Sequence, residues 1–358
     1  MLGIVRFFLA SCVVVFHLSA QVSYLGQFSV NCFYVISGFL ITMILNETYK
    51  FNLATFSLNR FLRLYPTYYF FLLIGSLIIF LMPHANEFHL SWTGRFLSGD
   101  GISNALIFPW ALVCEKADTH PFGLFFGSCP FISDGSRFRI VASSWSVGVE
   151  LICYFVLWLF IARHWLSTML FVVLLSCYHA FIFYTVGSQS AVYAPVVAAL
   201  LPFSIGSTGF YIYKKLKPYL FFSLKMQVMI LLASILVFML NWYMFNQTQT
   251  NGWNPTHYYI NNIIALLIVI LLVDSKPKGK LGYFSKLLGD LSYPVFLSHY
   301  FGGYFAWLII GFNNPSRGWE IFSLGYAISI AMGLVSVFLI DRRISQVRNK
   351  IRPVKRPS

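Results

Sequence analysis

The stretch RFFLASCVVVFH, from Arg6 to His17, decides the kind of fold. The ten residues between its two ends carry no charge, and the apolar run continues outward on both sides. A second apolar run follows almost at once and no small-residue cleavage site is evident, so we expect a retained membrane helix and not a signal peptide. The 358-residue chain is 58% hydrophobic and 10% charged, with a mean hydropathy of +0.72. Soluble domains usually carry about 25% charged residues, so this composition predicts a polytopic membrane protein.

The apolar runs show no strand-like alternation, which predicts an all-α bundle of about ten transmembrane helices. Breakers at Pro66, Pro83, Gly187, Pro218 and Gly311 mark several ends. The expected spans are roughly 3–22, 28–46, 66–83, 144–162, 166–186, 191–213, 226–245, 258–273, 288–311 and 320–340.

The distribution of charge predicts that both termini are cytoplasmic. The formal net charge is +14, from 25 Lys and Arg against 11 Asp and Glu. With ten alternating spans, 20 of the 25 basic residues fall on the inner side, and five fall outside: Arg95, Lys116, Arg137, Arg139 and Arg317. This asymmetry follows the positive-inside rule and explains the charge without nucleic acid as a partner.

We expect one transmembrane domain over residues 1–340. Two segments lie outside its membrane spans. The outer connection 84–143 is too long for a structureless loop, so we expect one or two short helices in it. Cys114 and Cys129 lie there, where a disulfide and two free thiols remain open alternatives. The basic tail 341–358 is expected to lie on anionic inner-leaflet lipids.

Arg6 and His17 are the first candidate site residues. They are eleven residues apart, which places them on one helix face about 16 Å apart along the axis. Ionisable groups at membrane depth usually face a bundle interior or a watery cavity. A snorkelling arginine and a packed, hydrogen-bonded histidine are the alternatives.

The second and third spans add polar residues. Ser37 and Gly38 favour close helix packing, and Asn31 lies near the outer end of the same helix. Arg60 and Arg63 are neighbours if their segment is helical, and two guanidiniums suit the oxygens of a phosphate-bearing ligand. Plain inner-leaflet charge is the alternative.

Glu150 is a carboxylate inside the fourth span, in SSWSVGVELICY. Ser143, Ser146 and Tyr154 share its helix face. We expect Glu150 to lie beside Arg6 or His17, as a structural ion pair or as the group that makes the histidine a general base. His299 favours a satisfied core histidine, with a place at the same cavity as the alternative. No HExxH, CxxC, GxSxG or P-loop motif occurs, and no metal site is expected.

Four marks together resemble the membrane acyltransferase-3 family over residues 1–340. They are Arg6 and His17 in the first helix, the aromatic-x-x-Ser-Gly-aromatic pattern from Tyr34 to Phe39, the Arg60/Arg63 pair, and the run with Ser144, Ser146 and Glu150. Each mark alone is weak, but their order and sides of the membrane make the set specific.

The resemblance implies transfer of an acyl group, usually acetyl, from cytoplasmic acyl-CoA to an extracytoplasmic sugar. Arg60, Arg63 and Arg6 would then face the phosphates of acetyl-CoA, and His17 would act as base or acyl carrier. Glu150 would orient the base, and Ser144, Ser146 and Asn31 would assist substrate or oxyanion.

The chain ends soon after its last expected span, so we expect no second domain. Its size resembles the standalone members that acetylate lipopolysaccharide O-antigen in the bacterial inner membrane. A secondary transporter or flippase is the main alternative, although no internal repeat is evident. A sensor or assembly protein is the third.

Overall fold

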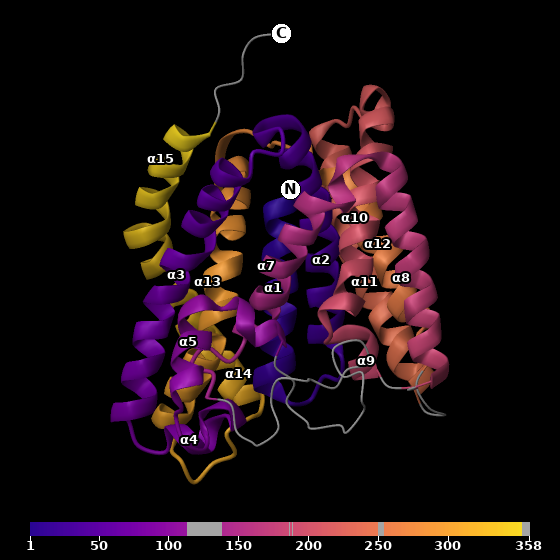
Figure 1. The fold of residues 1–358 in the computed structure, drawn as a ribbon. Helices are drawn as coiled ribbons and strands as arrows, with labels where there is room; N and C mark the ends of the chain where they lie inside the picture. The colour runs from indigo at the N-terminus through magenta and orange to yellow at the C-terminus, as the bar shows by residue number, and fades with distance from the viewer. Residues whose placement is uncertain (113–137, 186, 188, 250–253, 353–358) are drawn as a thin grey trace.

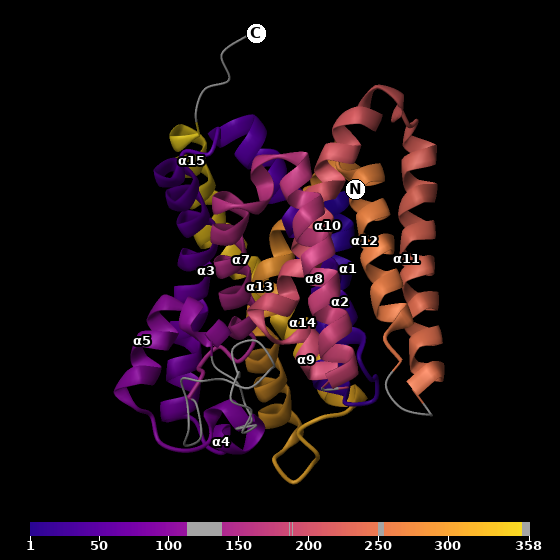
Figure 2. The same cartoon turned by 45° about the vertical axis from the view of Figure 1, so that its right-hand side comes forward.

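The computed structural model describes residues 1–112, 138–185, 187, 189–249 and 254–352. Within these ranges the chain forms helices and no strands, which confirms the all-α prediction. The long helices stand side by side as one bundle (Figures 1 and 2). They are α1 Leu2–Ser19, α2 Leu25–Ile44, α3 Leu53–Leu81, α7 Ser144–Leu159, α8 Trp165–Thr185, α10 Val196–Leu216, α11 Leu224–Thr248, α12 Thr256–Leu272, α13 Gly279–Ile310 and α14 Trp319–Ser336.

Each of the ten expected spans overlaps one of these helices. Seven helical stretches in the described part of the chain are long and apolar enough to cross a membrane: α1, Leu25–Tyr49, α3, α8, Val196–Tyr219, α11 and Trp319–Ile351. The apolar helices α7 and α12 are shorter, and α13 is not among the seven. The protein is therefore a multi-pass helical membrane protein. That α7, α12 and α13 also cross the membrane, as the expected count of ten requires, stays a prediction.

The third span begins earlier than the sequence pattern indicated. The expected range began at Pro66, but α3 starts at Leu53 and carries Pro66 in its interior. Asn52 caps the helix, because its side chain accepts a hydrogen bond from the backbone N–H of Thr55 at 3.0 Å. A proline removes one backbone hydrogen bond, which a membrane helix tolerates among packed neighbours. The consequence is that Arg60 and Arg63 lie on a continuous helix.

Close packing of α2 against α10 depends on glycine. A Cβ added to Gly38 would lie 2.1 Å from the carbonyl oxygen of Phe203, and one added to Gly206 would lie 2.0 Å from that of Val35. Small residues let membrane helices approach backbone to backbone. The expected packing role of Gly38 is therefore confirmed. By contrast, α8 and α11 expose large apolar side chains, including Leu170, Leu174, Leu232 and Leu236.

The two ends of the bundle differ in what they carry. Met1 and the basic helix α15 (Arg342–Ile351) lie at one end, which we call the terminal end (Figure 1). The short helices α4 (Ala85–Phe88) and α5 (Ser98–Leu106) lie at the other, the loop end. A π-helical turn, Val337–Asp341, joins α14 to α15. Accordingly, α1 runs from the terminal end to the loop end.

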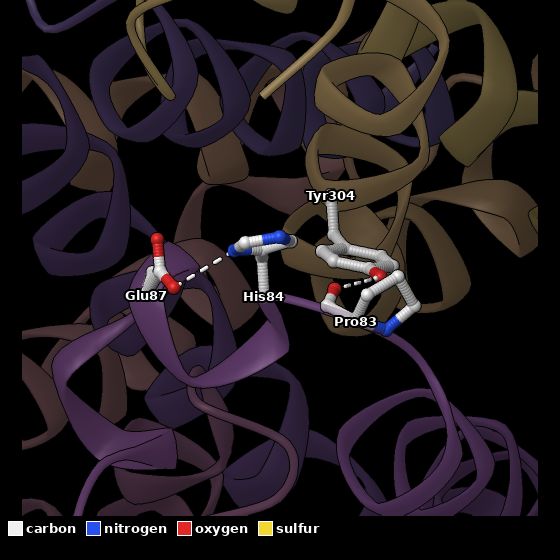
Figure 3. Close-up of polar contacts among 4 residues, drawn as sticks. All are labelled: Pro83, His84, Glu87 and Tyr304. Atoms are coloured by element: carbon white, nitrogen blue, oxygen red, sulfur yellow. Dashed lines mark hydrogen bonds and ion pairs between the residues drawn. The ribbon is translucent and has the colours of Figure 1, made fainter. Parts of the chain in front are cut away.

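The described part of the long connection is docked on the bundle. The Tyr304 hydroxyl on α13 donates to the carbonyl oxygen of Pro83 at 2.7 Å. Next to it, Nδ1 of His84 lies at hydrogen-bond distance, 2.8 Å, from Oε1 of Glu87 (Figure 3). Trp92 is buried and donates from Nε1 to the carbonyl of Ile140 at 3.0 Å. The expected short helices are present as α4 and α5. The alternatives for Cys114 and Cys129 lie outside the described residues.

Candidate active site

Arg6 and His17 both lie against α13, which packs along α1. The charges of Arg63 and Glu150 and, more weakly, of Asp290 on α13 act on Arg6, and the Nδ1 atom of His17 lies 2.6 Å from the hydroxyl of Tyr300. Asp290 and Tyr300 are ten residues apart on α13, which runs parallel to α1 along this contact. Both α1 side chains are half-buried. The prediction that they share one helix face is confirmed, and the shared face is directed into the bundle.

The ring of His17 is held by residues of α13. It stacks on the ring of His299, with centroids 5.2 Å apart and planes 21° apart, and Tyr300 binds its Nδ1. If Nδ1 carries the proton and donates to Tyr300, the Nε2 atom of His17 keeps a free lone pair. In that tautomer Nε2 can accept a proton from a substrate or attack an acyl carbon.

His299 is buried as expected, but it is not fully satisfied. Its Nδ1 lies 2.7 Å from the carbonyl oxygen of Phe296 and must be the donor there, because a carbonyl only accepts. Its Nε2 is therefore an acceptor, and it has no partner among the described residues. An unpartnered buried acceptor is rare in a folded protein. The ring of His299 also stacks on that of His17, so His299 lies beside the candidate site.

A rim of cationic and aromatic groups surrounds Tyr300 at the loop end. The ring of His89 lies 4.3 Å from that of Tyr300, and the guanidinium of Arg317 lies 4.0 Å from the ring of Phe88. Burial, with smaller contributions from the charges of Arg139 and Arg317, lowers the pKa of His89 to about 3. His89 is therefore neutral. Burial also lowers the pKa of Arg317 from its usual value.

Although three histidines lie near one another here, the described residues contain no group of His, Cys, Asp and Glu that could hold a metal ion. The guanidinium of Arg317 and the rings of Phe88, His89 and Tyr300 form a cationic and aromatic rim next to His17.

Glu150 does not contact His17. Its Oε1 accepts a hydrogen bond from Ser37 Oγ at 2.6 Å and another from the hydroxyl of Tyr154. Arg6 interacts with Glu150 through its charge, but the two form no ion pair within 4 Å. The expected direct contact of Glu150 with His17 or Arg6 is therefore wrong. The reason is that α7 turns Glu150 toward α2, whereas α13 covers the ring of His17.

Arg60 and Arg63 lie at the terminal end together with an arginine that the sequence pattern did not single out. Nη2 of Arg60 donates to Oδ1 of Asn59 at 3.3 Å, and Nη2 of Arg348 donates to the same oxygen at 3.1 Å. The charge of Arg63 acts on Arg6, Arg60 and Arg348. Four guanidiniums from α1, α3 and α15 therefore share one region, which we call the arginine cluster.

The remaining candidates are buried and bind other groups. Ser146 donates to the carbonyl of Ser143 at 3.1 Å, and Ser144 is fully buried at the start of α7 beside Tyr68. Asn31 accepts from Asn261 of α12 at 3.2 Å. Within the described part of the chain, none of the three side chains forms a hydrogen bond with the side chain of Glu150 or His17, so their expected roles stay predictions.

Sequence reasoning missed the side chains that hold the site together. Ser37 was interpreted as packing and Tyr154 only as part of a stripe, yet both bind Glu150. Tyr300 and Arg348 carried no signal, because their partners lie 283 and 289 residues away in sequence.

This geometry defines a class of protein. It is a multi-pass helical membrane protein with a histidine site at one end and an arginine cluster at the other. The family model described as an acyltransferase domain matches residues 2–342. The chain therefore belongs to the acyltransferase-3 family and is an acyltransferase, which confirms the resemblance found in its four motifs. Comparison with curated proteins and with solved structures gave no match.

Proposed function

We propose that this protein transfers an acetyl group from cytoplasmic acetyl-CoA to a hydroxyl of an extracytoplasmic sugar, with His17 as the reacting side chain. The observation that carries the proposal is the placement of His17. Its ring is half-buried, is fixed by Tyr300 at 2.6 Å, and lies on the same helix face as Arg6. A histidine held by its Nδ1 can present Nε2 to a substrate.

The arginine cluster supports the donor end of the proposal. Acetyl-CoA carries phosphates, and guanidiniums bind phosphate oxygens through their forked donors. Arg6, Arg60 and Arg63 lie in this cluster. The basic residues at the terminal end also favour a cytoplasmic position for it, since membrane proteins keep Lys and Arg on that side. The thioester arm would extend along α1 toward His17, about 16 Å along the helix from Arg6.

The chemistry balances along either of two routes. In the first, Nε2 of His17 takes the proton of the sugar hydroxyl, the oxygen attacks the thioester carbonyl, and the carbon–sulfur bond breaks to release the CoA thiolate, which takes up a proton. In the second, Nε2 of His17 attacks the thioester carbonyl, and the carbon–sulfur bond breaks to release the CoA thiolate. The sugar oxygen then attacks the acetyl carbon, the carbon–nitrogen bond breaks to free the imidazole, and the hydroxyl proton passes to the thiolate. Both routes form an ester and a free thiol.

The acceptor end faces the rim around Tyr300. Aromatic rings and the guanidinium of Arg317 offer stacking and hydrogen bonding to a polar ligand. We take lipopolysaccharide O-antigen in the bacterial inner membrane as the acceptor, and the resemblance to standalone family members supports this choice. Glu150 acts in this proposal on the arginine side of the site, through Ser37 and Tyr154.

The test is purified protein incubated with radiolabelled acetyl-CoA and O-antigen. The wild type should form an acetyl ester on the sugar. His17→Ala should reduce the rate by at least 100-fold, since general acid–base catalysis contributes about 10²–10⁴. His164→Ala is the matched control, because His164 is exposed at the terminal end. Full activity of His17→Ala would contradict the assignment of His17, and transport of acetyl-CoA without ester formation would indicate the transporter alternative.

A further inference from the structure

The basic helix α15 is not simply laid on the lipid surface. Its exposed residues include Arg342 and Arg343, but Arg348 is only 8% exposed and turns inward against α3. Nε and Nη2 of Arg348 lie 3.4 and 3.1 Å from Oδ1 of Asn59, and Nδ2 of Asn59 donates to the backbone carbonyl of Arg348 at 3.4 Å. Asn59 itself is fully buried. Arg348 of this tail therefore faces α3 and not lipid, and the expectation that the tail lies on anionic lipids stays a prediction for its other basic residues.

The arginines around Asn59 carry more N–H donors than the Asn59 side chain can accept hydrogen bonds from. Its single amide oxygen accepts from both Arg348 and Arg60, although each guanidinium offers five N–H donors. Nε of Arg60 is buried and has no hydrogen-bond partner among the described residues. Like charges in a low-dielectric region repel unless an anion lies between them.

The nearby carboxylates do not neutralise the cluster directly. Asp341 accepts from Thr67 at 2.5 Å, and Glu150 accepts from Ser37. Asp290 interacts with Arg6 through its charge. Across the described residues, none of these acids forms an ion pair within 4 Å with an arginine of the cluster. The cluster therefore has donors and charge available for an anionic ligand.

We propose that Arg348 is a further residue of the acyl-CoA site, where it binds a phosphate of acyl-CoA together with Arg60 and Arg63. This inference rests on the proposed function and extends it, because it makes α15 a wall of the donor site. Asn59 acts as the positioning residue, since its amide oxygen holds the two guanidiniums side by side with their remaining N–H groups free for phosphate oxygens.

The test measures binding of CoA to the purified protein by calorimetry. Arg348→Ala should weaken CoA binding about 10- to 100-fold, the loss expected for one charge-assisted hydrogen-bonded contact. Arg343→Ala is the matched control, because it removes the same charge from an exposed position of the same helix. It should leave the Kd unchanged. Arg348→Lys should weaken binding less than Arg348→Ala, since it keeps the charge but loses the fork.

A purely structural role for Arg348 predicts a different result. If Arg348 only fastens α15 to α3, Arg348→Ala lowers the melting temperature but binds CoA as tightly as Arg343→Ala does, and the inference is overturned. A lipid phosphate is the other possible source of the anion. Protein in nanodiscs with and without phosphatidylglycerol separates the two, because dependence on Arg348 for the lipid but not for CoA also overturns it. Failure of the wild type to bind CoA at all would instead refute the proposed function.

Discussion

Replacing Tyr300 by phenylalanine removes one hydroxyl from the site and keeps the ring. That hydroxyl lies 2.6 Å from Nδ1 of His17. The ring contacts with His299 at 4.2 Å and with His89 at 4.3 Å do not need the hydroxyl, so they survive the change. The substitution therefore removes the hydrogen bond to His17 and keeps the ring contacts.

The magnitude follows from what the bond does. Without it, Nδ1 of His17 loses this partner and the imidazole ring is no longer held in one orientation by Tyr300. Losing a hydrogen bond of this kind costs about 1–3 kcal/mol. If the cost falls on the transition state, kcat decreases roughly 5- to 150-fold. The KM for acetyl-CoA should change little, because the arginine cluster lies at the other end of α1.

Initial rates of ester formation, measured over a range of acetyl-CoA concentrations, check this expectation. Tyr326→Phe is the matched control. Its hydroxyl also makes a 2.6 Å hydrogen bond to a residue of α1, but that residue is Ser11 and not His17. Equal decreases in kcat for the two variants would show that the effect is one of packing, and an unchanged kcat for Tyr300→Phe would refute the positioning of His17 by Tyr300.

Two further predictions concern stability. Gly38→Ala should lower the melting temperature of the purified protein, because its Cβ would lie 2.1 Å from the backbone of Phe203 and separating α2 from α10 costs about 1–3 kcal/mol. Gly99→Ala is the control and should not lower it, because no atom lies within 4 Å of the added Cβ. Equal melting temperatures of the two variants would contradict the close contact at Gly38. Acid should also destabilise the protein through His89, whose pKa is lowered from 6.5 to about 3 in the fold, since protonation then favours the unfolded state. The stability it contributes is fully present above pH 6.5 and is lost as the pH falls toward 3, by at most about 1.4 kcal/mol per pH unit. His89→Gln should show a shallower decline of melting temperature between pH 7 and pH 5, and an identical decline would argue against a buried neutral His89.

The helices were predictable because their signal is local. Apolar runs of membrane length report on the residues within each run, and all ten expected ranges overlap a helix. The misplaced starts, at Leu53 for α3 and Gly279 for α13, have one cause. Both helices extend beyond the apolar run into polar segments, which hydropathy alone does not assign to a helix.

The site was predictable only in part. The spacing of Arg6 and His17 gave their common face correctly, because helix geometry is fixed at about 100° per residue. Their partners could not be read in the same way. Glu150 was expected beside Arg6 or His17. Its charge acts on Arg6, but the rotation of α7 directs its hydrogen bond to Ser37, which lies 113 residues away in sequence.

The sequence by itself determined an all-helical membrane chain and its family, and it supplied the candidate site residues, whose roles stay predictions. Only the tertiary structure decided that Tyr300 holds His17, that Ser37 and Tyr154 hold Glu150, and that Arg348 joins Arg60 at Asn59. The physical reason is that a helix forms from interactions within a few residues, whereas each of these partners is set by how whole helices rotate and pack against one another.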